Sequence, residues 1–257
     1  MAIIKCQGHC FEDIQAVIFD KDGTLANVEP YLRLVGEARS HCIEAQVPRL
    51  YLPVMQALGI DENGIDPTGL MAVGSREENK IATAAYVAAA GYGWTSALAM
   101  VEKAFLQAQT QLPAKVTQTP LLEGGTALLQ RLKSVGVKVG IASADTHEEV
   151  AAFVNYNRLN SVSWYCGISA GKLAKTHPNF LAFACEAMNI DCSATLIIGD
   201  SASDLQLSRQ GGAGFLGMTG GWQREFAINL LEDVPSDGGA NAAIAFVNRL
   251  SQVECFD

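Results

Sequence analysis

Three charged residues follow a short apolar run near the start of the chain. Asp20, Lys21 and Asp22 come directly after Ala16–Phe19, and Gly23 follows them. On an extended strand the two aspartates would face opposite ways. A turn that begins at the strand end, loosened by Gly23, can bring both carboxylates into one pocket while Lys21 points away. Carboxylates placed in this way can ligate a metal ion, attack an electrophile or transfer protons.

Reactive side chains also follow other apolar runs. Ser143 ends VGIAS, Asp200 ends LIIGD, and Lys175 lies in a loop after the run Val162–Tyr165. In open parallel sheets, ligands bind in the crevice outside the carboxyl ends of the strands. We therefore expect these three side chains to converge with Asp20 on one rim of a sheet.

Each of these residues also has a purely structural interpretation. An aspartate after a strand often caps a helix or forms a turn, Ser143 can bond to neighbouring backbone, and Lys175 can be a solvated surface lysine. Asp204 can cap its helix or form a local ion pair. Asp145 or Thr146 is expected to cap the following helix, with a glutamate three residues on. The combination of these residues, rather than any one of them, indicates a site.

The alternation of elements predicts the fold class. Short apolar runs predict buried strands at Ala16–Phe19, Val137–Ala142, Val162–Tyr165, Thr195–Ile198 and Ala213–Met218. Amphipathic patterns predict helices at Gly125–Val135, Thr146–Asn157, Pro178–Met188 and Ser203–Gln210. This order is typical of an α/β protein with a Rossmann-like parallel sheet and helices on both faces. Gly211–Gly221 is interpreted as a final strand and Gly238–Leu250 as a helix packed on the sheet.

Residues 30–119 break this alternation. They are rich in alanine, leucine and glutamine, and they predict helices at Tyr31–Gln46, Tyr51–Leu58, Glu77–Ala90 and Thr95–Gln109. We therefore expect a core domain formed by residues 1–29 and 120–257. Residues 30–119 are expected to form a smaller all-α domain inserted after the first strand.

Four motifs in order resemble those of the haloacid dehalogenase superfamily. DKDGTL, Asp20 to Leu25, resembles its first motif, and Ser143 in GIASAD resembles the second. Lys175 in KTHPNF resembles the third, although Thr176 replaces a usual proline and Lys172 is a second candidate. GDSASD, Gly199 to Asp204, resembles the fourth. The helical insert matches the position of that superfamily's α-helical cap, and the chain is similar to phosphoglycolate phosphatases and to β-phosphoglucomutase.

This resemblance implies roles for the converging side chains. Asp20 would attack the phosphorus of a phosphate ester and form an aspartyl phosphate. Asp22 would protonate the departing oxygen and then accept a proton from the water that hydrolyses the intermediate. Ser143 and Lys175 would bind the phosphate oxygens, and Lys175 would also bridge to the nucleophile.

The resemblance also implies magnesium as the cofactor. Its ligands would be Asp20, the backbone carbonyl of Asp22, and Asp200, while Asp204 would contact a metal-bound water or orient the other ligands. Relatives that displace halide or cleave carbon–phosphorus bonds lack an aspartate at the position of Asp22. The chain is therefore expected to act on phosphate esters.

One loop of the insert is a candidate for substrate recognition. VGSREEN, Val73 to Asn79, looks similar to the loop by which β-phosphoglucomutase holds the second phosphate of its substrate. The alternative is a helix start with Ser75 as N-cap and Glu78 as its partner. Arg76 is the candidate substrate-binding residue in either case.

Three functions are consistent with these features. The first is a magnesium-dependent phosphatase of small phosphorylated metabolites, such as phosphoglycolate or a sugar phosphate. The second is a phosphosugar mutase that uses the same Asp20 and Asp22 but returns the phosphate to the sugar. The third is a catalytically silent binding or regulatory protein.

Composition restricts the partners and the compartment. The formal net charge of −9, without any basic run, argues against a nucleic-acid partner held through its phosphates. No apolar stretch reaches the roughly 18 residues of a membrane span. The N-terminus lacks the apolar centre of a signal peptide, so the seven cysteines are expected to be reduced thiols of a cytoplasmic protein. Cys6 and Cys10 flank His9, but no second pair at zinc spacing accompanies them. The sequence does not indicate an oligomeric state.

Overall fold

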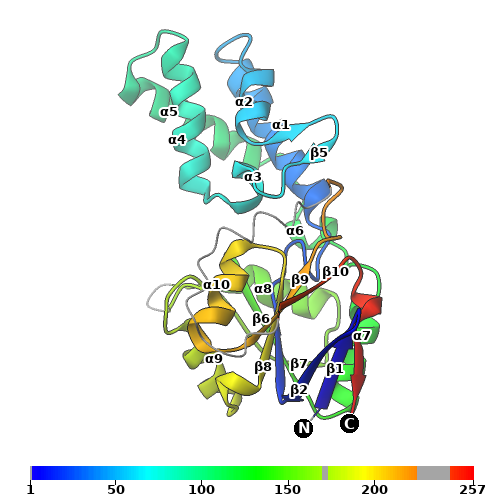
Figure 1. The fold of residues 1–257 in the computed structure, drawn as a ribbon. Helices are drawn as coiled ribbons and strands as arrows, with labels where there is room; N and C mark the ends of the chain where they lie inside the picture. Colours follow the sequence, from blue (N-terminus) through cyan, green and yellow to red (C-terminus); the bar gives the residue numbers. More distant parts are fainter. Residues whose placement is uncertain (1, 170–172, 225–243) are drawn as a thin grey trace. The chain divides into compact units, whose positions relative to one another are not determined.

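The structure, a computed structural model, describes residues 2–169, 173–224 and 244–257. These residues fall into two compact units (Figure 1). The sheet unit contains the described residues up to Asn27, Pro120–Gly221, and those from residue 244 onward. The helical unit contains Val28–Thr119 and Trp222–Arg224. Residues 28–29 and 222–224, which the sequence places in the core domain, therefore group with the helical unit instead.

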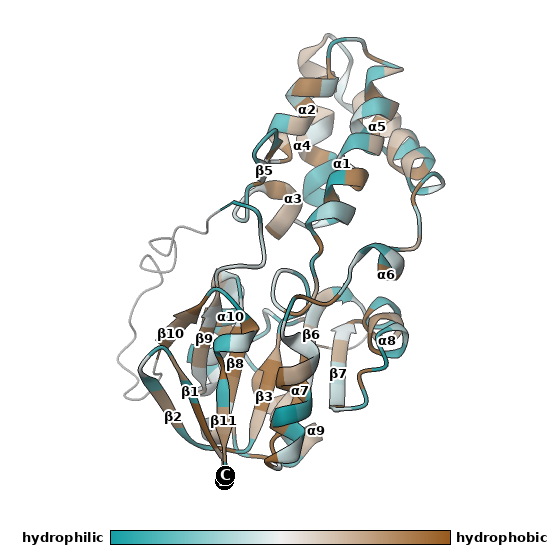
Figure 2. Cartoon of the chain, turned by 90° about the vertical axis from the view of Figure 1, so that its right-hand side faces the viewer, coloured by the Kyte–Doolittle hydropathy of each residue, from teal (hydrophilic) through white to brown (hydrophobic). Residues whose placement is uncertain are grey.

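A six-stranded parallel sheet forms the centre of the sheet unit. Its strand order is β10-β9-β8-β3-β6-β7, and each neighbouring pair is parallel. The strands are β3 (Ala16–Phe19), β6 (Lys138–Thr146), β7 (Val162–Ile168), β8 (Thr195–Gly199), β9 (Gly214–Met218) and β10 (Ile244–Val247). β3 is fully buried and brown in Figure 2, and it lies between β8 and β6. The predicted α/β, Rossmann-like fold is confirmed.

Helices cover both faces of this sheet. They are α7 (Gly125–Ser134), α8 (His147–Tyr156), α9 (Phe180–Met188) and α10 (Ala202–Gly211). Side chains alternate along a strand, so Ile18, Ile197 and Phe215 point to one face, where they pack with α9 and α10 in one apolar cluster. Val17 and Val139 point to the opposite face, on which α7 and α8 contact β6.

The predicted C-terminal helix is wrong for the residues that the structure describes. Ile244–Val247 forms strand β10, paired in parallel with β9, while residues 238–243 of that prediction lie outside the described residues. β9 is therefore not the final strand. Gly217 of β9 makes room for the ring of Phe246, which would lie 2.4 Å from a Cβ at that position. Ile244, Phe246 and Val247 are residue types enriched in strands, and they form one where β9 offers an edge to pair with.

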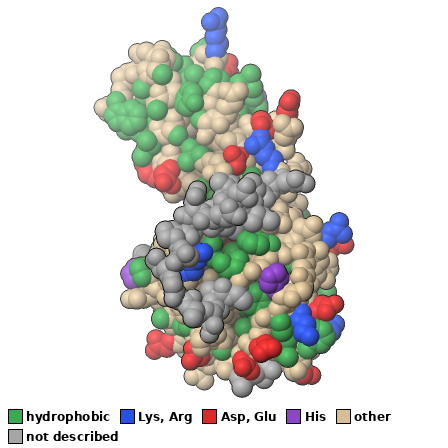
Figure 3. Space-filling view, in the orientation of Figure 1, with side chains coloured by type: hydrophobic (Ala, Val, Ile, Leu, Met, Phe, Trp, Pro, Cys, Tyr) green, Lys and Arg blue, Asp and Glu red, His purple; other side chains and the backbone are tan. Residues whose placement is uncertain are grey.

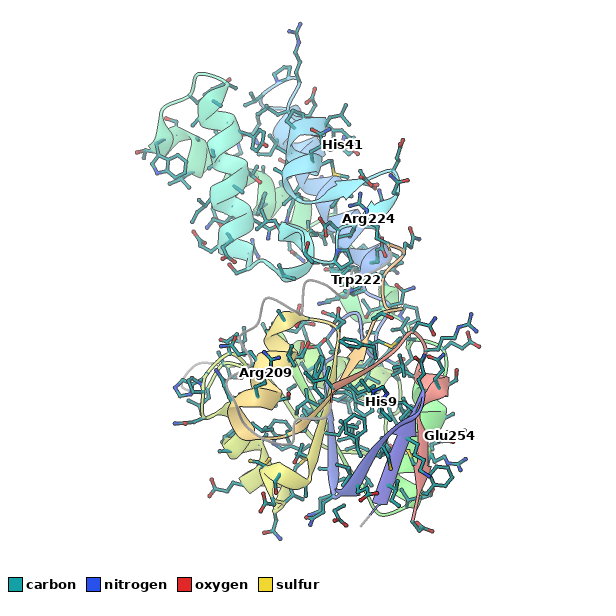
Figure 4. The ribbon with its side chains drawn as sticks, in the orientation of Figure 1. His9, His41, Arg209, Trp222, Arg224 and Glu254 are labelled. Carbon is teal, nitrogen blue, oxygen red and sulfur yellow. The ribbon has the colours of Figure 1, made fainter. Side chains whose placement is uncertain are left out.

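A second, antiparallel sheet in the order β11-β1-β2 completes the sheet unit, and the sequence analysis does not predict it. Its strands are β1 (Ala2–Cys6), β2 (His9–Ile14) and β11 (Glu254–Phe256). Gln7 and Gly8, with φ of +45° and +84°, form the tight turn between β1 and β2. Cys6 and His9 pair across this turn, and Figure 4 labels His9 and Glu254. The Cys6–Cys10 segment is therefore an ordinary hairpin.

The helical unit consists of short and medium-length helices around an apolar core. These are α1 (Glu29–Glu44), α2 (Tyr51–Ala57), α3 (Leu70–Val73), α4 (Arg76–Ala89), α5 (Trp94–Gln109) and α6 (Lys115–Gln118). Small residues such as Ala84, Ala97 and Ala104 belong to this core and allow close packing of α4 and α5. The unit is not all-α as expected, because β4 (Ile60–Asp61) pairs with β5 (Gly64–Ile65) in a short hairpin.

The surface of the helical unit also carries apolar side chains, green in Figure 3. Trp94 and Leu106 of α5, for example, are 49% and 55% exposed. Scattered exposure of this kind is ordinary for globular proteins. Within the described ranges, no helix combines the length and the apolar character needed to cross a membrane.

The segment Trp222–Arg224 joins the helical unit although it follows β9 in sequence. Trp222 is 9% exposed and belongs to the apolar core of this unit. The N–H of Gln223 donates to Oε2 of Glu29 (2.7 Å), a buried carboxylate whose other oxygen accepts from a backbone N–H of β5 (2.8 Å). Arg224 forms an ion pair with Asp61. Figure 4 labels Trp222 and Arg224.

Candidate active site

The carboxyl edge of the main sheet brings three of the predicted site residues onto neighbouring strands. The last residue of β3 pairs with Ile141 of β6 and with Ile198 of β8. Because these strands are parallel and in this register, their ends lie at nearly the same level. Asp20 directly follows β3, Asp200 directly follows β8, and Ser143 lies within β6, two residues after Ile141. The three residues therefore share one edge of the sheet.

Lys175 reaches the same edge from a loop. Its ammonium forms ion pairs with the carboxylates of Asp20 and Asp204, the second at 2.5 Å. The side chains of Lys175, Asp20 and Asp204 are only 7%, 12% and 0% exposed. The convergence of these segments, which are far apart in sequence, is thus present in the structure.

Asp204 serves both as a helix cap and as a partner of Lys175. One of its oxygens, Oδ2, accepts hydrogen bonds from the backbone N–H (3.1 Å) and the hydroxyl (2.6 Å) of Ser201, the N-cap of α10. Gly199 makes room for this carboxylate, since a Cβ there would lie 2.2 Å from Asp204 Cγ. The local cap therefore fixes the orientation in which Oδ1 meets Lys175.

Three carboxylates at this edge form an acidic triad. Oxygen atoms of Asp20, Asp200 and Asp204 lie within 4.8 Å of one another. Thr24 Oγ1 donates to Oδ1 of Asp200 (3.2 Å) and so orients that side chain. No other cluster of three or more His, Cys, Asp or Glu side chains has this spacing in the part of the chain that the structure describes. A set of oxygen donors of this kind fits a hard divalent cation.

The family of the protein follows from comparison with known proteins. Residues 14–212 match the haloacid dehalogenase-like hydrolases, a region that covers more than half of the 257 residues. The chain belongs to this family. No curated protein matches the sequence significantly.

Solved structures with the same fold include several haloacid dehalogenase-like proteins. A family member from Deinococcus radiodurans with bound phosphate and sodium has a TM-score of 0.61 and 19% identity, covering 92% of this chain and 92% of that chain. A predicted phosphoglycolate phosphatase from Haemophilus somnus has a TM-score of 0.61 and 15% identity, with 94% and 96% covered. A protein described as a β-phosphoglucomutase from Thermotoga maritima has a TM-score of 0.61 and 17% identity, with 93% and 96% covered. Identities this low establish a common fold.

In this haloacid dehalogenase-like hydrolase, the chain turns immediately after Asp20. The carbonyl of Lys21 accepts hydrogen bonds from the N–H groups of Leu25 (2.9 Å) and Ala26 (2.8 Å). Gly23 has a φ of +80°, a conformation that glycine adopts without strain. The predicted turn at the strand end is therefore present, and it ends the extended geometry of β3.

The sequence predicts that Lys21 points away from the pocket that holds Asp20 and Asp22; in the structure its side chain contacts that of Asp22. Lys21 is 1% exposed, and its ammonium contacts the carboxylate of Asp22 and lies 2.9 Å from Oδ2 of Asp145. The alternation of side chains applies only while a strand stays extended, and this turn starts right after the strand. Lys21 and Asp22 therefore lie on the same side.

Ser143 forms the local hydrogen bond that its structural interpretation predicts. It is 4% exposed, and its Oγ accepts from the N–H of Asp145 (3.1 Å). This bond uses a lone pair, so the hydroxyl proton can still be donated to another group. Thr146 is the N-cap of α8 in a capping box with Glu149, as expected.

Burial and charge together set the protonation of the edge. Burial raises the pKa of Asp20 to about 7, with the Lys175 ammonium opposing this change and the Asp204 carboxylate adding to it. Burial also disfavours the charged form of Lys175, but the carboxylates of Asp20 and Asp204 outweigh it and raise the pKa of Lys175. Further positive charge at this edge would favour the ionised form of Asp20.

Arg76 lies in the helical unit, as the first residue of α4, and its side chain is exposed. Ser75 is the N-cap and forms a capping box with Glu78, so the structural interpretation of this loop is confirmed. The guanidinium of Arg39 in α1 lies over the ring of Phe105, with its Cζ atom 4.3 Å from the ring centre. Burial, together with the positive charge of Arg76, lowers the pKa of Arg39 to about 10. The role of Arg76 in substrate binding stays a prediction.

Sequence reasoning missed three residues near the sheet edge. Thr24 was visible only as part of the DKDGTL motif, and its bond to Asp200 spans most of the chain. The ion pair between Lys21 and Asp145 could not be predicted, because no spacing pattern in the sequence connects these two residues. Lys172, the second candidate for the third motif, lies outside the described residues.

Proposed function

We propose that this protein is a magnesium-dependent phosphatase that hydrolyses a small phosphorylated metabolite, of the phosphoglycolate or sugar phosphate type, through an aspartyl phosphate. The observation that carries this proposal is the ion-paired group of Asp20, Lys175 and Asp204, together with Asp200, at the carboxyl edge of the sheet. Membership in the haloacid dehalogenase-like hydrolases supports it.

In the first step, a carboxylate oxygen of Asp20 attacks the phosphorus of the ester. The bond from phosphorus to the ester oxygen breaks, and Asp22 donates a proton to that departing oxygen. Lys175 lies in contact with Asp20, so its ammonium is placed to attract the oxygens of the incoming phosphoryl group. The buried Ser143 hydroxyl is positioned at the same edge to donate to one of them.

In the second step, Asp22 accepts a proton from water, and the water oxygen attacks the phosphorus of the aspartyl phosphate. The bond between phosphorus and Asp20 then breaks, which releases inorganic phosphate and restores the carboxylate. Asp22 returns to its protonated form, so the same residue serves both steps. An aspartate at this position distinguishes phosphate-ester hydrolysis from the halide displacement after which the family is named.

The acidic triad fits a magnesium ion. Asp20 and Asp200 would be side-chain ligands, Asp22 would contribute its backbone carbonyl, and Asp204 would orient the shell. When bound, the ion supplies positive charge that offsets the repulsion between a dianionic phosphate and a carboxylate nucleophile. Burial raises the pKa of Asp20, and positive charge beside it would favour the ionised, nucleophilic form.

We further propose that the helical unit acts as a cap that selects the substrate. Arg76 and the partly buried Arg39 are two guanidinium groups close enough to influence each other's charge, and this pair is suited to a second anionic group of the substrate. The same feature favours a phosphosugar mutase as the second candidate function, since a mutase must hold an intermediate that carries two phosphate groups.

The seven cysteines support a cytoplasmic location. All are free thiols in the structure, which suits a reducing compartment. The acidic net charge of −9 supports a small phosphorylated metabolite rather than a nucleic acid as partner.

The decisive experiment measures phosphate release from a panel of phosphorylated metabolites, with Mg²⁺ and with a chelator. Wild type is expected to release phosphate from at least one metabolite only when Mg²⁺ is present. Asp20→Asn should lower kcat by roughly four orders of magnitude or more, as the loss of a nucleophile does in other enzymes. Activity that survives this substitution would remove Asp20 from the mechanism.

The same panel separates the two candidate functions. Conversion of one sugar phosphate isomer into another, without net phosphate release, would select the mutase. Arg76→Ala should raise KM about tenfold for substrates with a second anionic group and leave singly charged substrates nearly unchanged. A silent binding protein would show neither reaction and would not become phosphorylated by acetyl phosphate.

A further inference from the structure

The ammonium of Lys21 is a buried charge that the two steps above do not use. Its side chain is 2% exposed and lies 5.3 Å from the centre of the Phe153 ring of α8. Lysine is almost never fully buried unless it is paired. Lys21 contacts the carboxylate of Asp22 and lies 2.9 Å from Oδ2 of Asp145. A charge with two acidic partners in the core needs an explanation.

The partners of Lys21 come from separate elements. Asp22 belongs to the turn after β3, Asp145 to the end of β6, and Phe153 to α8. The two carboxylates are 25% and 16% exposed, whereas the ammonium between them is almost completely shielded from water. An ion pair shielded in this way is screened little by solvent, so it holds its members in one arrangement.

A general acid must have a defined orientation. The carboxyl group of Asp22 can rotate about its side-chain torsions, and only some rotamers present an oxygen to the leaving group. Contact of Lys21 with Oδ1 restricts this rotation and so favours one orientation of the carboxyl group. Positioning of this kind contributes to rate because it removes a search through unproductive orientations.

We propose that Lys21, held by Asp145, is a positioning residue that fixes the Asp22 carboxyl group for proton transfer to the leaving oxygen. This inference rests on the proposed function, since it assigns a task within the same site. A purely structural role is the alternative, in which Lys21 only stabilises the turn. The two roles differ in whether the decrease in kcat/KM on substituting Lys21 depends on the leaving group of the substrate.

The test compares two substrates of the wild-type enzyme, each with Mg²⁺. Acetyl phosphate has acetate as leaving group, which departs without a proton. The alkyl phosphate from the panel with the highest kcat/KM has a basic leaving oxygen that needs one. Because kcat/KM reports the steps up to departure of the leaving group, it isolates the proton transfer from Asp22.

Lys21→Met is expected to lower kcat/KM about a hundredfold for the alkyl phosphate and less than about threefold for acetyl phosphate. Lys21→Arg, which keeps a cation, should recover most of the loss. Asp22→Asn should show the same selective loss, and adding Lys21→Met to it should cost little more, because both changes remove one function. Lys80→Met, which removes an ion-paired lysine of α4, is the matched control and should leave kcat/KM unchanged for both substrates.

Lys21→Met leaves two carboxylates without their shared cation and can fail to fold. The variant Lys21→Met with Asp145→Asn removes part of that repulsion and should fold and keep the selective loss. Equal losses with both substrates, or no loss with either, would overturn the positioning role while leaving the phosphatase intact. Absence of any Mg²⁺-dependent hydrolysis by wild type would overturn the proposed function and this inference together.

Discussion

The buried polar side chains of the sheet unit differ in kind from those of the helical unit. The sheet unit buries the charged groups Lys21, Lys175, Asp200 and Asp204. The buried polar groups described in the helical unit are neutral apart from Glu29. Burying a charge costs desolvation free energy that an ion pair often does not fully recover, whereas burying small apolar residues stabilises. The difference indicates that the sheet unit gives up stability to build a reactive edge, while the helical unit gains stability from apolar packing.

Among the substitutions that compare the two units, the largest effect is expected from removing a buried charge of the sheet edge. Lys175→Met should lower kcat/KM for phosphate release by a hundredfold to a thousandfold, about 3–4 kcal/mol of barrier, because the ammonium contacts Asp20 and Asp204 at the sheet edge. Steady-state kinetics with the best metabolite measure this. Lys80→Met provides the comparison in the helical unit and should cost less than twofold. A similar loss of kcat/KM in both variants would show that the two units do not differ in this way.

A core substitution in the helical unit should act on stability. Trp222→Ala should lower the free energy of unfolding by about 3 kcal/mol, because it removes a large side chain from the apolar core. Urea denaturation measures the change, and calorimetric binding of Mg²⁺ to the sheet edge should be unaffected. Tyr156→Ala, at an aromatic residue that is 60% exposed, should stay within about 0.5 kcal/mol of wild type. If Trp222→Ala is as mild as Tyr156→Ala, the assignment of Trp222 to the core is wrong.

The charged edge should make stability depend on pH when the metal is removed. The pKa of Asp20 rises from its ordinary 3.8 to about 7, so between these values the folded state binds more protons than the unfolded state. The contribution of Asp20 to stability therefore falls as pH rises through this window. Asp20→Asn removes this fall and should be more stable than wild type above pH 7, on the order of 2 kcal/mol, and nearly equal to it near pH 4.

Urea denaturation at several pH values in a chelator measures this difference. Added Mg²⁺ should make wild type more stable than Asp20→Asn, since the ion binds the ionised Asp20 of wild type and not the amide. A constant difference between the two proteins at every pH would show that Asp20 titrates normally in the folded state.

The smallest expected effects come from two matched helix caps. Ser75→Ala and Thr146→Ala each break a capping box with a glutamate, in the helical unit and in the sheet unit, and each should cost about 1 kcal/mol of stability. Thermal unfolding measures both. Ser75→Ala should also raise KM for substrates with a second anionic group, because Ser75 fixes the start of the helix that carries Arg76. An increase in KM with Thr146→Ala instead would assign substrate selection to the sheet unit.

The site was predictable from sequence wherever a residue lies at the end of a buried apolar run. Asp20, Ser143 and Asp200 follow such runs, and parallel strands necessarily bring their carboxyl ends together. Lys175 required the resemblance of its motif, because a loop lysine has no periodic signal. The pairing of Lys21 with Asp145 was not predictable, since it depends on how a turn directs one side chain.

The fold shows the same limit. Strands with continuous apolar runs were recognised, whereas the antiparallel strands of the second sheet are short and mix apolar with charged residues without a regular alternation, and they were missed. Ile244–Val247 is itself rich in residues that favour a strand, but it is short and was assigned to the helix expected from the alanines that precede it; β9 offers the edge to which it pairs, and Gly217 offers space for Phe246. Tertiary context of this kind is absent from any local pattern.

The segment Trp222–Arg224 affects how this protein can be recombined with its relatives. A domain inserted through two junctions behaves as a cassette, and exchanging residues 28–119 would suffice to transplant it. Here such a chimera would leave behind the indole that fills the core of the insert and the arginine that pairs with Asp61. The insert as a continuous stretch of sequence therefore differs from the insert as a packed unit. Only a transfer that includes both residues 28–119 and residues 222–224 would keep this unit intact.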